Sequence, residues 1–173
     1  MKQSRIYGVC LMLVLAVLGW ANIGTAAAEG EPFITLWEGN SHETLKIPIV
    51  GHYKISIRYT GYLSHYGYLV KEEEVYIRPG ECYEITPPFH AEYQVEASPE
   101  GVRYIQMCAR VGNGLKVIGS RDKLIRLCQW GDVKWETMEN AFLGCQNMTV
   151  SKYVGIPDLS QVTTMERMFS GCT

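Results

Sequence analysis

The chain has 173 residues, of which 47% are hydrophobic and 20% charged, and its formal net charge is −2. This length allows one ordinary domain or two small ones. The weakly acidic balance argues against a nucleic-acid-binding protein, which requires a clustered basic face.

Residues 1–28 have the layout of a secretory signal peptide. Lys2 and Arg5 make a basic start, an apolar run covers residues 6–20, and three alanines end the segment at Ala28. The apolar run is shorter than the ~20 residues of a membrane-spanning helix. The sequence therefore predicts export, cleavage after Ala28, a secreted or cell-surface location and no transmembrane segment in the cleaved protein.

Residues 29–120 are predicted to form a small antiparallel β-sandwich of Ig-like or PKD-like type. Apolar and polar side chains alternate over residues 53–59, as in a strand with one buried face. Shorter strand-like runs lie near residues 33–36, 45–49, 66–70, 75–77, 82–85 and 93–97. Glycine, proline and asparagine separate these runs, which indicates short strands joined by turns.

Tyrosines are concentrated in this segment, above all at residues 61–68. Tyr62, Tyr66 and Tyr68 are candidate ligand-binding residues, because a tyrosine ring buries area while its hydroxyl finds a hydrogen-bond partner. The alternative is that tyrosine is present here simply because it suits strands.

Residues 121–173 contain a repeat with a period of 27 residues. Residues 135–145 return as residues 162–172 with six identical positions: Thr137, Met138, Glu139, Phe142, Gly144 and Cys145 recur as Thr164, Met165, Glu166, Phe169, Gly171 and Cys172. Apolar residues at i, i+3, i+4 and i+7 predict a two-turn helix in each copy, and glycine is suited to ending it. Structural roles are given to Met138, Phe142, Gly144 and Cys145 and to their equivalents Met165, Phe169, Gly171 and Cys172.

A period of this size is typical of leucine-rich-type solenoids. The predicted fold class is therefore α+β, with the sandwich followed by the start of a leucine-rich-repeat-like α/β solenoid. A solenoid needs about three repeats or more. Two copies predict either a fragment of a longer repeat protein or an end coil that meets a partner.

The repeat resembles a known family. W-G-x-x-x-W-x-x-M-x-x-A-F-x-G-C over residues 130–145 and P-D-L-S-x-V-T-T-M-x-x-M-F over residues 157–169 are similar to the BspA-type leucine-rich-repeat surface proteins of bacteria. The resemblance implies a surface protein whose repeats serve adhesion or host contact, with no catalytic residues. The family's preceding module often carries an acidic turn, but residues 59–68 contain no aspartate, so no role of that turn is carried over.

No motif for catalysis, a cofactor or a metal is present. The chain has no G-x-S-x-G, H-E-x-x-H or phosphate-binding glycine loop, and a hydrolase set of Ser64, His90 and Glu92 has no motif behind it. Five cysteines remain after residue 28, an odd number that leaves the disulfide pattern open: Cys82, Cys108, Cys128, Cys145 and Cys172. None forms a C-x-x-C pair, which argues against zinc.

Two functions follow from these features. The first is a non-catalytic bacterial surface protein that binds proteins of a host or neighbouring cell through its repeats. The alternative is a glycan-binding module that uses the tyrosine-rich face of the sandwich, with the repeats as a spacer.

Overall fold

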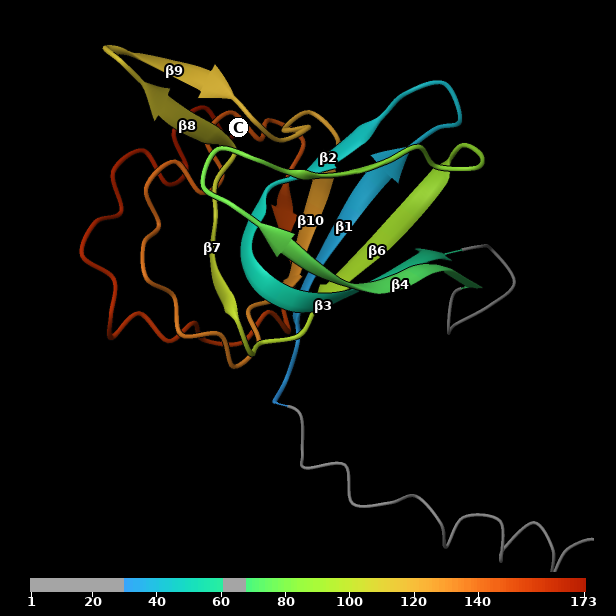
Figure 1. Ribbon diagram of the computed structural model, residues 1–173, viewed down its shortest axis with the longest axis horizontal. Helices are drawn as coiled ribbons and strands as arrows, with labels where there is room; N and C mark the ends of the chain where they lie inside the picture. Colours follow the sequence, from blue (N-terminus) through green and yellow to red (C-terminus); the bar gives the residue numbers. More distant parts are fainter. Residues whose placement is uncertain (1–29, 61–67) are drawn as a thin grey trace, which may run out of the picture.

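The described part of the chain is built from strands joined by turns. The computed structural model describes residues 30–60 and 68–173, and within them the backbone forms eleven strands and no helix. The largest sheet has seven strands in the order β11-β10-β1-β6-β3-β4, with β7 pairing to β3 (Figure 1). Its strands are β1 (Phe33–Gly39), β3 (Ile49–Thr60), β4 (Tyr68–Ile77), β6 (Ala91–Ala97), β7 (Val102–Ile105), β10 (Leu124–Gln129) and β11 (Thr149–Val150).

Two smaller sheets complete the strand inventory. Strand β2 (Leu45–Ile47) pairs with β5 (Tyr83–Ile85), and β8 (Cys108–Val111) pairs with β9 (Gly114–Val117), both antiparallel. Pro48 separates β2 from β3, because proline cannot donate a ladder hydrogen bond. The run predicted over residues 45–49 is therefore divided between two sheets.

One face of the seven-stranded sheet is buried. On β3, Tyr53, Ile55 and Ile57 are buried and alternate with polar neighbours, as the period-2 pattern predicts. Ile55 lies opposite Ala97 of β6, which in turn lies opposite Phe33 of β1, and all three side chains are fully buried. Such cross-strand rows are the units that stabilise a sheet.

The other face of the sheet carries charged pairs. Lys54 on β3 lies 3.2 Å from the carboxylate of Glu72 on β4, which also accepts a 2.7 Å hydrogen bond from Ser56. These exposed pairs make this face hydrophilic, although each contributes little to stability. At β3 and β4 the sheet therefore has one apolar and one polar face.

The C-terminal segment shares the core of the sheet. Strand β10 pairs with β1 in antiparallel fashion and with β11 in parallel. The ring of Phe33 packs edge-on against Trp135 at 5.0 Å and lies 6.3 Å from Trp130, between ring centroids. One continuous hydrophobic cluster contains residues from both sides of position 120.

The predicted α+β fold class is wrong, because the described residues contain no helix. The predicted leucine-rich-repeat-like α/β solenoid is therefore wrong too, while the strands predicted between residues 33 and 97 are present in the described ranges. The predicted sandwich is not confirmed: the buried face of the large sheet shares its core with the β2–β5 pair and with the turns of residues 130–145.

Two predictions fall on residues that the structure does not describe. The proposed signal peptide, residues 1–28, and the tyrosine-rich stretch at residues 61–67 lie outside the described residues. No helix of the described residues is long and apolar enough to cross a membrane.

Candidate binding face

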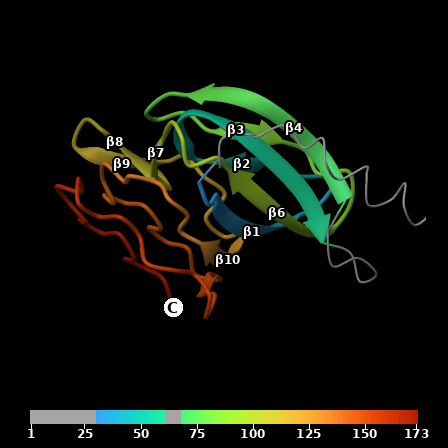
Figure 2. The same cartoon turned by 90° about the horizontal axis from the view of Figure 1, so that it is seen from below.

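The two repeat copies lie side by side in parallel. We call residues 135–145 coil 1 and residues 162–172 coil 2, and Figure 2 shows the orange and red segments that contain them running alongside each other. Alternate amides of coil 1 donate to carbonyls of coil 2. The pairs, with their N···O distances, are Met138 to Thr164 (3.0 Å), Asn140 to Glu166 (2.9 Å), Phe142 to Met168 (2.8 Å) and Gly144 to Ser170 (2.8 Å).

Other amides close turns within each coil. In coil 1 the N–H groups of Ala141, Leu143 and Cys145 donate to the carbonyls three residues earlier. The equivalent amides of coil 2, those of Met168, Ser170 and Cys172, do the same. Each coil is thus a spiral of successive turns, and in coil 1 the amides between those that close the turns bond to coil 2.

The backbone conformation repeats with the same period. Asn140 has φ 56° and Arg167 has φ 55°, while Gly144 and Gly171 have φ 77° and 74°. Left-handed φ values are uncommon for residues other than glycine and asparagine. Because both coils adopt them at equivalent positions, the two coils have the same local geometry.

The helices predicted at residues 138–145 and 165–172 are wrong for a physical reason. An isolated helix of about eight residues is marginal in water, because nucleation consumes the free energy of its first hydrogen bonds. In coil 1, the amides of Met138, Asn140, Phe142 and Gly144 instead bond to coil 2. The i, i+3, i+4, i+7 spacing of Met138, Ala141, Phe142 and Cys145 did identify buried residues, since all four are fully buried.

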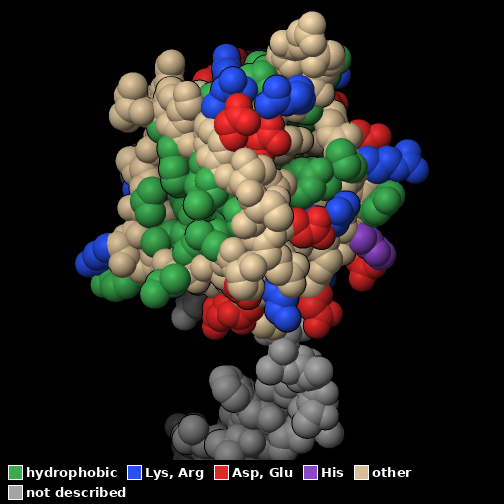
Figure 3. Space-filling view, turned by 90° about the vertical axis from the view of Figure 1, so that its left-hand side faces the viewer, with side chains coloured by type: hydrophobic (Ala, Val, Ile, Leu, Met, Phe, Trp, Pro, Cys, Tyr) green, Lys and Arg blue, Asp and Glu red, His purple; other side chains and the backbone are tan. Residues whose placement is uncertain are grey.

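Apolar side chains that are fully buried in coil 1 have equivalents in coil 2 that are partly or largely exposed. We call end face the apolar surface of coil 2 formed by Val162, Met165, Met168, Phe169 and Cys172, which are equivalent to the fully buried Trp135, Met138, Ala141, Phe142 and Cys145. Met165 is 56% exposed and Phe169 is 45% exposed. Figure 3 shows a broad hydrophobic cluster on the side of the molecule where the C-terminal segments lie.

The stacking of the coils is aromatic at its centre. The rings of Phe142 and Phe169 are nearly parallel, with an interplanar angle of 6° and centroids 5.5 Å apart. Trp130 packs against Phe142 from another side at 5.8 Å. One face of the Phe169 ring therefore rests on coil 1, while nearly half of the side chain remains accessible.

Charged side chains lie at the rim of the coils. Arg110 contacts Glu139 of coil 1 at 3.2 Å and Glu166 of coil 2 at 3.5 Å, and these glutamates occupy the same repeat position. Arg167 pairs with Glu166 at 3.1 Å. The end face is thus apolar at its centre, with a charged pair beside it.

All five cysteines of the described residues are free thiols. Cys145 is fully buried, and burial raises its pKa to about 12. Cys172 donates its thiol proton to the carbonyl of Phe142 at 3.1 Å. Burial also raises the pKa of Cys172, so neither thiol is an activated nucleophile.

The predicted tyrosine site is described only in part. Tyr62 and Tyr66 lie outside the described residues, whereas Tyr68 is 56% exposed. The Tyr68 ring stacks on Tyr59 at 5.0 Å, and Phe89 meets Tyr59 edge-on at 4.7 Å. We call Tyr59, Tyr68 and Phe89 the aromatic cluster; Tyr59 and Phe89 also line an adjoining hollow of about 820 Å³.

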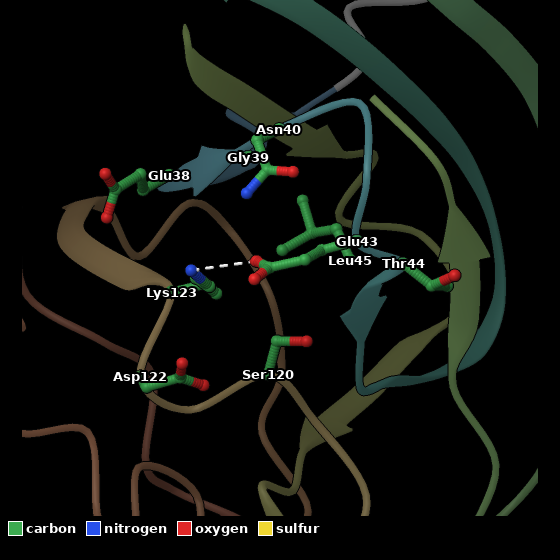
Figure 4. Close-up of a pocket in the computed structure, with 9 residues that line it drawn as sticks. All are labelled: Glu38, Gly39, Asn40, Glu43, Thr44, Leu45, Ser120, Asp122 and Lys123. Atoms are coloured by element: carbon green, nitrogen blue, oxygen red, sulfur yellow. Dashed lines mark ion pairs between the residues drawn. The ribbon is translucent and has the colours of Figure 1, made fainter. Parts of the chain in front are cut away.

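A polar depression of about 340 Å³ lies near the start of β10 (Figure 4). Glu38, Glu43 and Asp122 contribute carboxylates to its lining, and Lys123 forms an ion pair with Glu43 at 2.9 Å. Within the described ranges, no group of three or more histidine, cysteine and carboxylate side chains is arranged to hold a metal ion. The depression therefore lacks the geometry of a metal centre.

The sequence identified the repeat residues but assigned them only structural roles. It did not show that Met165 and Phe169 are exposed, nor that alternate amides of coil 1 bond to coil 2. The constant 27-residue offset was the available signal, because copies of one unit that stack in register place equivalent residues beside one another.

Comparisons with protein-family models, with curated proteins and with solved structures found no match. The resemblance of the repeat to BspA-type surface proteins therefore stays a prediction.

Proposed function

We propose that this is an exported, non-catalytic surface protein that binds other proteins through the end face. The observation that carries the proposal is the difference in burial between equivalent residues: Phe142 is fully buried and Phe169 is 45% exposed. Clusters of exposed apolar side chains with polar surroundings are typical of protein-interaction surfaces. The sequence pattern of residues 1–28 and the resemblance to adhesive repeat proteins support export and a role in contact with a host or neighbouring cell.

The experiment compares two phenylalanines of similar exposure. Phe169→Asp places a charge on the end face, and Phe89→Asp places one on the aromatic cluster, where Phe89 is 41% exposed. Binding to immobilised fibronectin and collagen is measured by surface plasmon resonance. We expect Phe169→Asp to weaken binding at least about tenfold and Phe89→Asp to leave it unchanged. Equal losses, or no binding by the unsubstituted protein, would contradict the proposal.

Glycan binding by the aromatic cluster is the second candidate. The supporting observation is the stacked Tyr59–Tyr68 pair, with Phe89 edge-on beside it, because exposed aromatic rings with hydroxyl groups suit the apolar faces and hydroxyls of sugars. On a glycan array, this candidate predicts the reverse pattern: binding is lost in Phe89→Asp and kept in Phe169→Asp. An array without binding would exclude it.

A further inference from the structure

We infer that the hollow beside the aromatic cluster binds a small organic cation with an apolar body, of the quaternary-ammonium type. The hollow has a volume of about 820 Å³, and strands β1, β3, β6 and β10 all contribute to its lining. A volume of this size is typical of small-molecule sites. The lining shares no residue with the end face, so this inference goes beyond the proposed function.

Two carboxylates of the lining oppose each other on neighbouring strands. Glu38 of β1 is paired directly with Glu92 of β6. Directly opposed residues of antiparallel strands lie on the same face with their Cβ atoms about 4.5–5.5 Å apart, and like charges at such positions destabilise a sheet. Thr60 of β3 lies opposite Glu92 on its other side, so the next strand brings no cation that would offset the repulsion.

Basic side chains near the two carboxylates compensate them poorly. Lys123 is held by Glu43 at 2.9 Å, and in Figure 4 the carboxylate of Glu38 points away from that pair. Among the described residues no lysine or arginine lines the hollow. His90 does line it, but its Nε2 lies 3.8 Å from the carboxylate of Glu38, its side chain is exposed, and it is charged only when protonated.

Carboxylates elsewhere on the same face of the sheet are paired with basic residues. Glu72 lies 3.2 Å from Lys54, and Glu96 lies 3.8 Å from Arg58. Within residues 30–60 and 68–173, Glu92 has no ion pair of this kind with a lysine or an arginine. A cationic ligand in the hollow would supply the missing positive charge.

The rest of the lining suits the apolar body of an organic cation. Tyr59 and Phe89 contact each other edge-on at 4.7 Å, Ile125 contributes an aliphatic side chain, and Phe89 is 41% exposed. Aromatic rings attract a cation that lies within about 6 Å of the ring centroid, and quaternary ammonium groups are recognised in this way. A metal ion fits less well, because no three metal-ligating side chains of the described residues are grouped to hold one.

The test compares choline with its neutral carbon analogue, in which a carbon atom replaces the nitrogen. Binding of each compound to the full chain is measured by isothermal titration calorimetry. We expect choline to bind with a Kd of about 1 mM or lower, and the analogue to bind at least about tenfold more weakly, because only the cation is attracted by the carboxylates and the ring. Equal affinities, or no binding of choline, would overturn the inference.

Three variants locate the site. Glu92→Gln should weaken choline binding at least about tenfold, and Phe89→Leu at least about twofold. Glu100→Gln is the matched control, since Glu100 is an exposed glutamate outside the hollow, and it should leave the affinity unchanged. Unchanged affinity in Glu92→Gln, or an equal loss in Glu100→Gln, would show that the cation binds elsewhere and that the inference is wrong.

Urea unfolding checks the role of Glu92 without reference to affinity. In the absence of choline, Glu92→Gln should raise the midpoint of unfolding, because it removes the repulsion from Glu38. Choline should raise the midpoint of the unsubstituted protein and not that of the variant. A lower midpoint for the variant would assign Glu92 a structural role and overturn the inference.

Free choline and the head group of a membrane lipid share the same cation. The inference concerns the free cation, because the phosphate next to the ammonium group in phosphatidylcholine would be repelled by the carboxylates of Glu38 and Glu92. Cosedimentation with phosphatidylcholine vesicles should therefore show no binding. Binding to the vesicles in place of free choline would contradict the inference.

Discussion

The two stacked phenylalanines provide the sharpest test of how the coils are stabilised. Phe142 and Phe169 are the same residue at the same repeat position with the same backbone geometry. They differ in what lies above them: coil 2 covers Phe142 completely, while Phe169 remains 45% exposed. Replacing each by alanine therefore measures the contribution of being covered by the next coil.

The two substitutions should differ by about 1–3.5 kcal/mol. Phe142→Ala leaves a cavity beneath Trp130 and Phe169, and burial of this kind is worth about 3–5 kcal/mol in phenylalanine-to-alanine substitutions. Phe169→Ala removes a side chain that is about half buried, and the loss of its buried area costs about 1 kcal/mol of unfolding free energy. It also removes part of the aromatic pair, which costs about 0.5–1 kcal/mol. Water can fill the space that it leaves, so no enclosed cavity adds to this cost.

The assay is urea unfolding followed by tryptophan fluorescence, since Trp130 and Trp135 lie in the same cluster as Phe142. The double variant is included to measure the coupling of the two rings. We expect a coupling of about 0.5–1.5 kcal/mol, because the rings are in direct contact. Equal destabilisation by the two single substitutions would refute the parallel stacking of coil 2 on coil 1.

Three further predictions concern other parts of the chain. Gly51→Ala should lower the free energy of unfolding in urea by at least about 3 kcal/mol, because residue 51 has φ 142° and an added Cβ would lie 2.0 Å from the backbone oxygen of Gly101. Gly80→Ala is the control: residue 80 has φ 82° but open space around it, so the substitution should cost about 1–2 kcal/mol. Iodoacetamide at pH 8 should modify Cys172 before Cys145, whose pKa is raised to about 12 by burial, and equal rates by mass spectrometry would contradict this. The pKa of Glu136 is lowered from its ordinary value of 4.5 by two hydrogen bonds from the guanidinium of Arg103. The ion pair contributes less than about 1 kcal/mol to the free energy of unfolding, because it is exposed. This contribution is present above pH 4.5 and is lost as the pH falls through the lowered pKa of Glu136 in the folded protein. Glu136→Gln should therefore reduce the difference in unfolding free energy between pH 7 and pH 3.

The strands of the large sheet were accessible to prediction because their pattern is local. In β3, Tyr53, Ile55 and Ile57 alternate with polar residues, and that alternation depends only on which face is buried. The runs at residues 66–70 and 75–77 were predicted as separate strands, but β4 is one strand over the described residues (Tyr68–Ile77). The central residues of β4 are charged and form ion pairs with β3. These contacts are not local in sequence, so the hydrophobic periodicity of the segment did not predict a continuous strand.

The coils were predicted incorrectly because their hydrogen bonds are not local. Met138, Ala141, Phe142 and Cys145 have helical spacing, yet that spacing specifies only which side chains are buried. The choice between a helix and a spiral of turns depends on whether the alternate amides have acceptors on a neighbouring coil. The remaining local signal in the sequence was the asparagine at position 140, because asparagine tolerates the left-handed conformation better than most residues.

Strand β4 and the end face differ in the side chains that they expose, and the difference supports the binding role proposed for the end face. Strand β4 ends the order of the large sheet, and its centre carries Lys71, Glu72, Glu73 and Glu74. Charged residues on an edge strand discourage pairing with other chains. In coil 2 the central side chains are instead Met165 and Phe169, which are exposed. Exposed apolar side chains without such charges are typical of protein-interaction surfaces, which is the property that the proposed function requires.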